Sequence, residues 1–115
     1  MKIGVISADV ASESRVALTP DAVKKLRKLG FDVVIQSGAG QAAYYDDELY
    51  QTAGANIAHT SVEVITQSQI ITTVHDLPAE ATEHLMSGQI IIGMLDPYRN
   101  TQLDNYASKG VTAFA

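Results

Sequence analysis

Residues 15–40 read RVALTPDAVKKLRKLGFDVVIQSGAG, a polar start followed by a helix signal and then a strand signal. Thr19 is a preferred N-cap residue, and Pro20 suits the first helical position because its missing N–H is not needed there. Gly30 favours the left-handed conformation that ends a helix, and the run 31–36 predicts a strand directly after it. The apolar residues between these signals recur at helical spacing and predict one buried stripe: Ala22, Val23, Leu26 and Leu29.

The same alternation of helix and strand extends outward from this stretch over the whole chain. Strands are predicted at 1–7, 31–36, 56–58, 69–74, 89–95 and 111–115. After the helix that begins at Pro20, further helices are predicted at 46–53, 62–67, 78–86 and 100–108. Asp46 is the expected cap of the second helix, and Ser61 is the expected cap of the third. This order is typical of parallel strands that are joined by helical crossovers.

Two isoleucine runs indicate how the sheet is covered. The runs at 70–71 and 90–92 are continuous rather than alternating, so we expect helices on both faces of those strands. The sequence therefore predicts a three-layer, Rossmann-like (flavodoxin-like) α/β fold with a parallel sheet and helices on both faces. The last predicted strand, 111–115, has no closing helix after it, so we expect the domain to be incomplete at its C-terminus.

The composition is that of one ordinary soluble domain. The chain has 115 residues, 46% of them hydrophobic, and its 8 basic and 13 acidic side chains give a formal net charge of −5. This balance argues against nucleic acid as a partner. Cysteine is absent, which excludes disulfides, thiolate metal sites and a cysteine nucleophile. No apolar run approaches the ~20 residues that span a bilayer, so we expect no membrane insertion by this segment.

A glycine-rich loop follows the predicted strand 31–36. Gly38 and Gly40 begin the sequence GAGQAA, which satisfies the G-x-G-x-x-A pattern of loops that hold a dinucleotide pyrophosphate. However, the strand is the second of the chain, and the next helix begins only after Asp46. The acidic residue expected about 20 positions later would be Glu63, which falls in a predicted helix. We therefore reject Gly38 and Gly40 as a nucleotide loop and predict a tight strand-to-helix turn.

Polar residues follow three of the predicted strands. Arg15 lies beyond the first strand, and His75 and Asp96 lie at the ends of two later ones. Open α/β sheets bind ligands at the carboxyl edge, so one cleft lined by these three residues is a hypothesis. Arg15 would either grip a carboxylate or phosphate with two N–H groups or pair with Glu13 at the surface. His75 and Asp96 would either perform acid/base chemistry or be ordinary strand ends, and they have no third ligand for a metal site.

Four motifs carry a resemblance over nearly the whole chain: MKIGV at 1–5, RVALTP at 15–20, SGAG at 37–40 and KGVTA at 109–113. They resemble the N-terminal domain family shared by alanine dehydrogenases and NAD(P) transhydrogenase alpha subunits. In alanine dehydrogenases, the arginine matched by Arg15 holds the substrate carboxylate, with a lysine and a catalytic histidine nearby. The corresponding positions here are His75 and Asp96, so the resemblance does not carry that amino-acid oxidation over to this chain.

Transhydrogenase alpha subunits also lack that lysine and histidine, and LDPYRN at 95–100 resembles their version of the loop. The resemblance thus implies an N-terminal segment of the NAD(H)-binding alpha subunit of a proton-translocating NAD(P) transhydrogenase. In the complete enzyme, hydride passes between NAD(H) and NADP(H). Residues 1–115 would be a partial domain, the NAD-binding domain would follow residue 115, and the segment alone would be inactive and bind neither nucleotide tightly.

The resemblance also implies partners and a location. The partners are the NAD-binding domain, the other transhydrogenase subunits and a second alpha subunit in a homodimer. The complete enzyme would place this segment on the cytoplasmic side, peripheral to the inner membrane. Two alternatives stay open. One is an alanine-dehydrogenase-like oxidoreductase domain, and the other is a stand-alone, non-catalytic α/β binding module such as a phosphoacceptor receiver domain.

Overall fold

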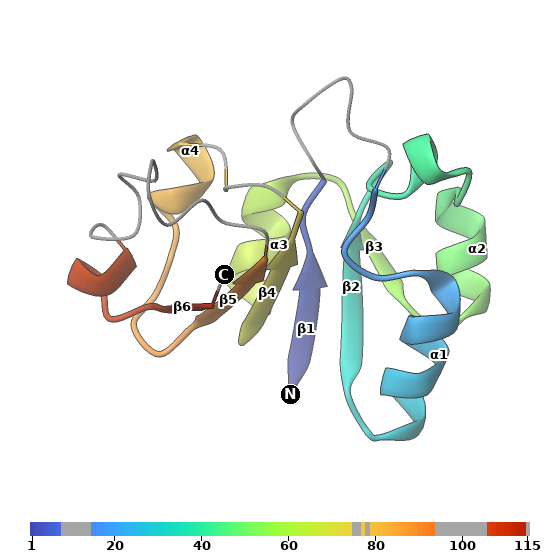
Figure 1. Cartoon of the computed structure of the whole chain (residues 1–115), viewed down its shortest axis with the longest axis horizontal. Coiled ribbons are helices and arrows are strands. Elements are labelled where there is room, and N and C mark those ends of the chain that lie inside the picture. Colours follow the sequence, from blue (N-terminus) through green and yellow to red (C-terminus); the bar gives the residue numbers. More distant parts are fainter. Residues whose placement is uncertain (8–14, 75–76, 78, 94–105, 115) are drawn as a thin grey trace.

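Six parallel strands form one sheet in the order β3-β2-β1-β4-β5-β6 (Figure 1). The computed structural model describes residues 1–7, 15–74, 77, 79–93 and 106–114. Within these residues the strands are β1 (Lys2–Val5), β2 (Asp32–Gln36), β3 (Asn56–Ala58), β4 (Ile70–Thr73), β5 (Ile90–Gly93) and β6 (Thr112–Phe114). The predicted parallel α/β fold is confirmed. Its strand order is that of Rossmann-type sheets, whereas flavodoxin-like sheets have the order 2-1-3-4-5.

Short helices connect the strands. They are α1 (Pro20–Lys28), the 3-10 helix η1 (Gln41–Ala43), α2 (Asp47–Thr52), α3 (Ser61–Gln67) and α4 (Ala79–Thr82). Residues 106–108 are also helical. Thr19 and Asp46 cap α1 and α2 as predicted, because their side-chain oxygens accept the N–H groups of Ala22 at 3.2 Å and Leu49 at 2.9 Å. Gly30 has a φ of +94° and ends α1 as expected.

The helices divide between the two faces of the sheet. Val23 of α1 and Tyr50 of α2 pack in one apolar cluster with Val5 and Ile35. Helices α3 and α4 and the helical residues 106–108 contribute to a second cluster, on the opposite face. Figure 1 shows α1 and α2 grouped beside β2 and β3. Right-handed crossovers explain this division. The crossovers through α1 and α2 run from β1 towards β3, whereas the later crossovers run in the opposite direction, so their helices lie on the opposite face.

Three local predictions are wrong, each for a physical reason. Leu29 is the C-cap of α1, where the chain turns towards β2, and its side chain is 73% exposed rather than part of the buried stripe. The cap of α3 is Thr60 rather than Ser61, because the Thr60 hydroxyl accepts the N–H of Glu63 at 3.2 Å. Ser61 is instead the first residue of the helix.

The third difference is the early end of α4, which was expected to span 78–86. The N–H of Leu85 donates to the Thr82 carbonyl at 3.3 Å in a tighter turn, and the Lys109 ammonium donates to the same oxygen at 2.9 Å. The N–H of Met86 donates instead to the side-chain oxygen of Gln89 at 2.7 Å. The helix therefore ends at Thr82, while Pro78 lies outside the described residues.

One row of side chains crosses all six strands on the α1 face of the sheet. Paired residues of parallel strands share a face, and the strand pairing places these residues in one row: Ile57, Ile35, Val5, Thr72, Ile92 and Phe114. Ile35 and Val5 are fully buried, whereas Ile92 is 46% and Phe114 is 55% exposed. We call the α1 face of β1–β3 the closed half-face and that of β4–β6 the open half-face.

The expectation that helices cover both faces of the isoleucine-rich strands is therefore only half right. Ile71 and Ile91 are fully buried and belong to the cluster on the α3 face. On the α1 face, the exposure of Ile92 shows that no described helix covers β5. The reason is the crossover handedness, which places α3 and α4 on the opposite face.

Candidate functional site

The strand order identifies one edge of the sheet as the place for a ligand. The chain adds β2 and β3 on one side of β1 and then adds β4 on the other side, so the order reverses between β1 and β4. In open α/β sheets, ligands bind at the carboxyl ends of the strands that flank such a reversal. Here those ends lead into Ile6 and Ser7 after β1 and into Val74 after β4.

Small-ligand sites have volumes of about 300 to 1,000 Å³, and a cavity of ≈ 440 Å³ lies beside this reversal. We call it the Arg15 cleft. Its walls come from the segment before α1 and from the ends of β4 and β5: Arg15, Val16, Ala17, Leu18, Thr72, Thr73, Val74, Ile92 and Gly93. It holds one guanidinium among mainly apolar walls. Such a site suits a ligand that has an anionic group and an apolar body.

Backbone contacts shape the floor of the Arg15 cleft. The Thr72 hydroxyl donates to the Gly4 carbonyl at 3.0 Å, which ties β4 to β1 below the cleft. A side chain at Gly93 would collide with the carbonyl oxygen of Thr73. Glycine at this position therefore lets the ends of β4 and β5 approach each other closely.

The segment that carries Arg15 is fixed from α2. Arg15 is exposed, while Val16, Ala17 and Leu18 are half-buried against the cluster that contains Val5 and Val23. The buried Tyr50 hydroxyl donates to the Leu18 carbonyl at 2.8 Å. Sequence reasoning did not identify Tyr50 as part of this site. The sequence offered one signal: a tyrosine in the predicted helix 46–53 needs a hydrogen-bond partner if its phenol is buried.

Of the three residues predicted to line a cleft, Arg15 lies in the wall of this cavity, and its predicted role stays a prediction. His75 and Asp96 lie outside the described residues, so their predicted roles stay predictions. The cleft includes Val74, the residue directly before His75. Nearby, the N–H of Ser7 donates to the side-chain oxygen of Gln36 at 2.9 Å, which links the ends of β1 and β2.

The glycine-rich loop is tied to α2 by a carboxylate. Gly38 has a φ of +82°, and its N–H donates to Asp47 at 2.9 Å, while the Ser37 hydroxyl donates to the same carboxylate at 2.6 Å. The hydrogen bonds from Gly38 and Ser37, in that order, lower the pKa of Asp47. At Gly40, an added Cβ would lie 2.6 Å from the Tyr50 ring and hydroxyl. The loop is therefore a tight turn that packs on α2, as predicted.

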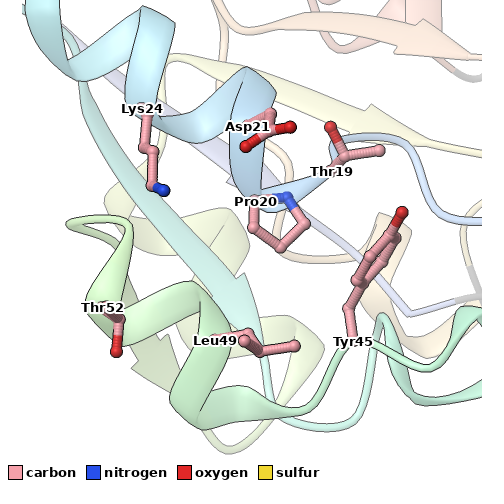
Figure 2. A pocket seen from close by; sticks show the side chains of 7 residues that line it. All are labelled: Thr19, Pro20, Asp21, Lys24, Tyr45, Leu49 and Thr52. Atoms are coloured by element: carbon pink, nitrogen blue, oxygen red, sulfur yellow. The ribbon is translucent and has the colours of Figure 1, made fainter.

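Two further cavities lie near α2. One of ≈ 310 Å³ borders the glycine-rich loop and is lined by Ser37, Gly38, Gln41, Asp46, Asp47 and Glu48. The other, of ≈ 350 Å³, is the groove between α1 and α2, lined by Thr19, Pro20, Asp21, Lys24, Tyr45, Leu49 and Thr52. Figure 2 shows Lys24 and Asp21 on the α1 side of this groove and Leu49 and Thr52 on the α2 side. The first cavity is acidic, and the second holds one charge of each sign.

Two kinds of feature are not found in the described part of the chain. Across residues 1–7, 15–74, 77, 79–93 and 106–114, no three His, Asp or Glu side chains are grouped to hold a metal ion. No helix in these same ranges is both long and apolar enough to cross a membrane.

Comparison with known proteins gives a consistent result. The family model "Alanine dehydrogenase/PNT, N-terminal domain" matches residues 4–115. The NAD(P) transhydrogenase subunit alpha of Cereibacter sphaeroides is 34% identical, and the match covers 100% of this chain and 22% of that protein. The alanine dehydrogenase of Mycobacterium tuberculosis strain H37Rv is 32% identical over 83% of this chain and 26% of its own length.

Solved structures agree with the sequence comparison. The transhydrogenase from Sinorhizobium meliloti superposes with a TM-score of 0.91 at 34% identity, covering all of this chain and 34% of that one. An L-alanine dehydrogenase also gives a TM-score of 0.91, at 26% identity over 32% of its chain. This chain thus spans between about a fifth and a third of the length of these relatives.

Proposed function

Because this chain belongs to the family of alanine dehydrogenase/PNT N-terminal domains, we propose that it works as part of an NAD(P) transhydrogenase alpha subunit. In the complete enzyme, hydride would pass between NAD(H) and NADP(H), coupled to proton translocation. Residues 1–115 would form part of the first domain, and an NAD-binding domain would follow them. The segment would help to wall the nicotinamide cleft and would be inactive alone.

One observation carries this proposal. The Arg15 cleft lies where the strand order reverses, and its wall combines one guanidinium with apolar side chains. Arg15 would provide the cation for an anionic group, and Val74 and Ile92 would provide apolar contact for the rest of a bound molecule.

The glycine-rich loop is a poor fit for a dinucleotide, and this supports a nucleotide site outside the segment. A pyrophosphate needs free backbone N–H groups and no opposing charge. In this loop the Gly38 N–H donates to Asp47, and the N–H groups of Ala39 and Gln41 donate to backbone carbonyls. The carboxylates of Asp46, Asp47 and Glu48 line the adjoining cavity and would repel a pyrophosphate. We therefore propose that Gly38 and Gly40 bind no nucleotide.

The partners proposed for the segment follow from the same assignment. The NAD-binding domain would lie against the Arg15 cleft, and other transhydrogenase subunits would accept or supply hydride. We propose a homodimer of alpha subunits and a position on the cytoplasmic side, peripheral to the inner membrane through the complete enzyme. The open half-face, with Ile92 and Phe114 exposed, is an apolar surface that the remaining polypeptide would cover.

Enzyme assays on the full gene product that contains this chain test the proposal. Purified protein, combined with its neighbouring transhydrogenase subunits, is expected to reduce an NADP analogue with NADH. Arg15→Ala is expected to reduce this rate, and Lys24→Ala, in the groove between α1 and α2, serves as the surface control. A full gene product that binds NADH but transfers no hydride would contradict the proposal.

A second candidate is an alanine-dehydrogenase-like oxidoreductase, because an alanine dehydrogenase is among the relatives and superposes equally well. Reduction of NAD that depends on an amino acid and is lost in Arg15→Ala would favour this candidate. Absence of both activities, together with phosphoryl-donor labelling of the chain, would favour a stand-alone binding module. The 115-residue chain itself is expected to show no tight NADH binding in a titration.

A further inference from the structure

We propose that Tyr50 is a positioning residue for the Arg15 cleft: its buried phenol holds the Leu18 carbonyl and so fixes the segment that carries Arg15. The inference rests on the proposed function in one respect, namely that the Arg15 cleft receives a ligand. The hydrogen bond joins residues 32 positions apart, at 2.8 Å. Tyr50 therefore connects α2 to the segment that carries Arg15.

The segment from Arg15 to Leu18 needs such a tie. It lies between β1 and α1 and belongs to neither a strand nor a helix, so no regular hydrogen-bond ladder sets its path. Its apolar side chains pack only half-buried on the core. Directly after it, Thr19 caps α1 and its carbonyl accepts the N–H of Val23 at 3.0 Å. A hydrogen bond to Leu18 thus fixes the residue before the helix cap, three positions from Arg15.

Tyr50 is itself held rigidly enough to serve as an anchor. Its side chain is fully buried, and the Tyr45 ring meets it edge-on with centroids 6.3 Å apart. Gly40 allows the glycine-rich loop to lie against the ring, where any Cβ would collide. The helix that carries Tyr50 is capped by Asp46 and tied to the glycine-rich loop through Asp47. The phenol therefore has a defined position before it meets Leu18.

The hydroxyl, rather than the ring, provides the proposed positioning. A phenylalanine would fill the same apolar space, whereas a buried phenol is unfavourable unless it is paired. Burial, with a smaller effect of Tyr45, raises the pKa of Tyr50 to about 12. The hydroxyl thus keeps its proton and can donate to Leu18 throughout the physiological range.

The test compares Tyr50→Phe with Tyr45→Phe in the full gene product. Both variants remove one phenol from the same aromatic pair, but only Tyr50 holds Leu18. Hydrogen exchange of the peptide that covers residues 15–19 is expected to become about fivefold faster in Tyr50→Phe, the loss of one hydrogen bond, and to stay unchanged in Tyr45→Phe. Unchanged exchange in Tyr50→Phe, or equal acceleration in both variants, would overturn the proposal.

A kinetic cycle with Arg15 separates positioning from general stability. In the assay that reduces an NADP analogue with NADH, Tyr50→Phe is expected to raise the KM for NADH about fivefold with little change in kcat. The reason is that Arg15 is displaced but not removed. The double variant with Arg15→Ala is expected to match Arg15→Ala alone, since Tyr50 would act through Arg15. Additive effects would overturn the proposal. If the gene product transfers no hydride, the proposed function fails, and hydrogen exchange alone still decides the role of Tyr50.

Discussion

The closed and open half-faces of the sheet both carry large apolar side chains but differ in cover. In the row that crosses all six strands, Ile35 and Val5 are fully buried beneath α1 and α2, while Ile92 and Phe114 are 46% and 55% exposed. The difference comes from topology rather than from residue type. Right-handed crossovers cover one half of this face and direct the later helices to the other side.

The Arg15 cleft lies at the boundary between these two halves. Its wall from Val16 to Leu18 packs against the closed side, and its wall at Ile92 belongs to the open side. A ligand there would contact a rigid surface on one side and a surface without helical cover on the other. Residues of the closed half-face therefore support the fold, whereas residues of the open half-face are available for binding.

The largest effect is expected when matched isoleucines of the two half-faces are truncated to alanine. Ile35→Ala is expected to lower the free energy of unfolding by about 3 kcal/mol, because it leaves a cavity in a fully buried cluster. Ile92→Ala, in the same row, is expected to cost less than about 1 kcal/mol, since its side chain is already half in water. Urea unfolding of both variants measures this. Equal losses would mean that the open half-face is covered.

A glycine substitution tests how tightly the closed half is packed. Gly40→Ala is expected to cost about 2 kcal/mol, because the added Cβ would lie 2.6 Å from the Tyr50 ring and 2.8 Å from the Tyr45 carbonyl. Gly30→Ala is the matched control, as it has positive φ but open space around it, and is expected to cost about 1 kcal/mol. Thermal unfolding compares them. A smaller loss for Gly40→Ala than for Gly30→Ala would refute the tight contact.

The carboxylate between β2 and α2 makes the stability of the closed half depend on pH. Asp47→Asn is expected to cost about 1 kcal/mol near neutral pH, since hydrogen bonds to a neutral amide are weaker than those to a carboxylate. Hydrogen bonds lower the pKa of Asp47, so its stabilising effect is complete above about pH 4 and is lost as the pH falls through the lowered value. Urea denaturation of wild type and Asp47→Asn between about pH 2 and pH 7 measures how the difference in unfolding free energy depends on pH. A difference from wild type that grows towards acid would contradict this assignment.

The smallest effect is expected at the edge of the open half. Phe114→Thr keeps a residue that favours strands and removes a ring that is 55% exposed. We expect a change in unfolding free energy within about 0.5 kcal/mol in the 115-residue chain. Calorimetry of Phe114→Thr, with Ile92→Ala measured in parallel, gives the change in unfolding free energy. A loss of about 2 kcal/mol or more would show that the ring is packed, and the open half-face would need to be redefined.

Local signals in the sequence were sufficient for most of the fold. Thr19, Pro20 and Asp46 mark helix starts through contacts within a few residues, so pattern alone locates α1 and α2. The end of α4 was not predictable in this way, because the contacts beside it, from Met86 to Gln89 and from Lys109 to Thr82, form only in the folded chain. The bare face beside Ile92 depends on strand order, which periodicity does not contain.

The candidate site was predictable to a smaller extent. Arg15 could be located because it follows the first strand, and the sheet places that strand at the reversal. Tyr50 could not be linked to it, because their connection runs through a contact between Tyr50 and Leu18 that only the folded chain creates. Sequence patterns thus identified the charged group but not the residue that holds its segment.

The lengths of the outermost strands have a consequence for solubility. Both β3 and β6, at the two margins of the sheet, are only three residues long. An unpaired margin offers its backbone to strands of other molecules, and short margins limit how many hydrogen bonds such an encounter can form. This brevity would limit pairing at these margins between copies of the 115-residue chain.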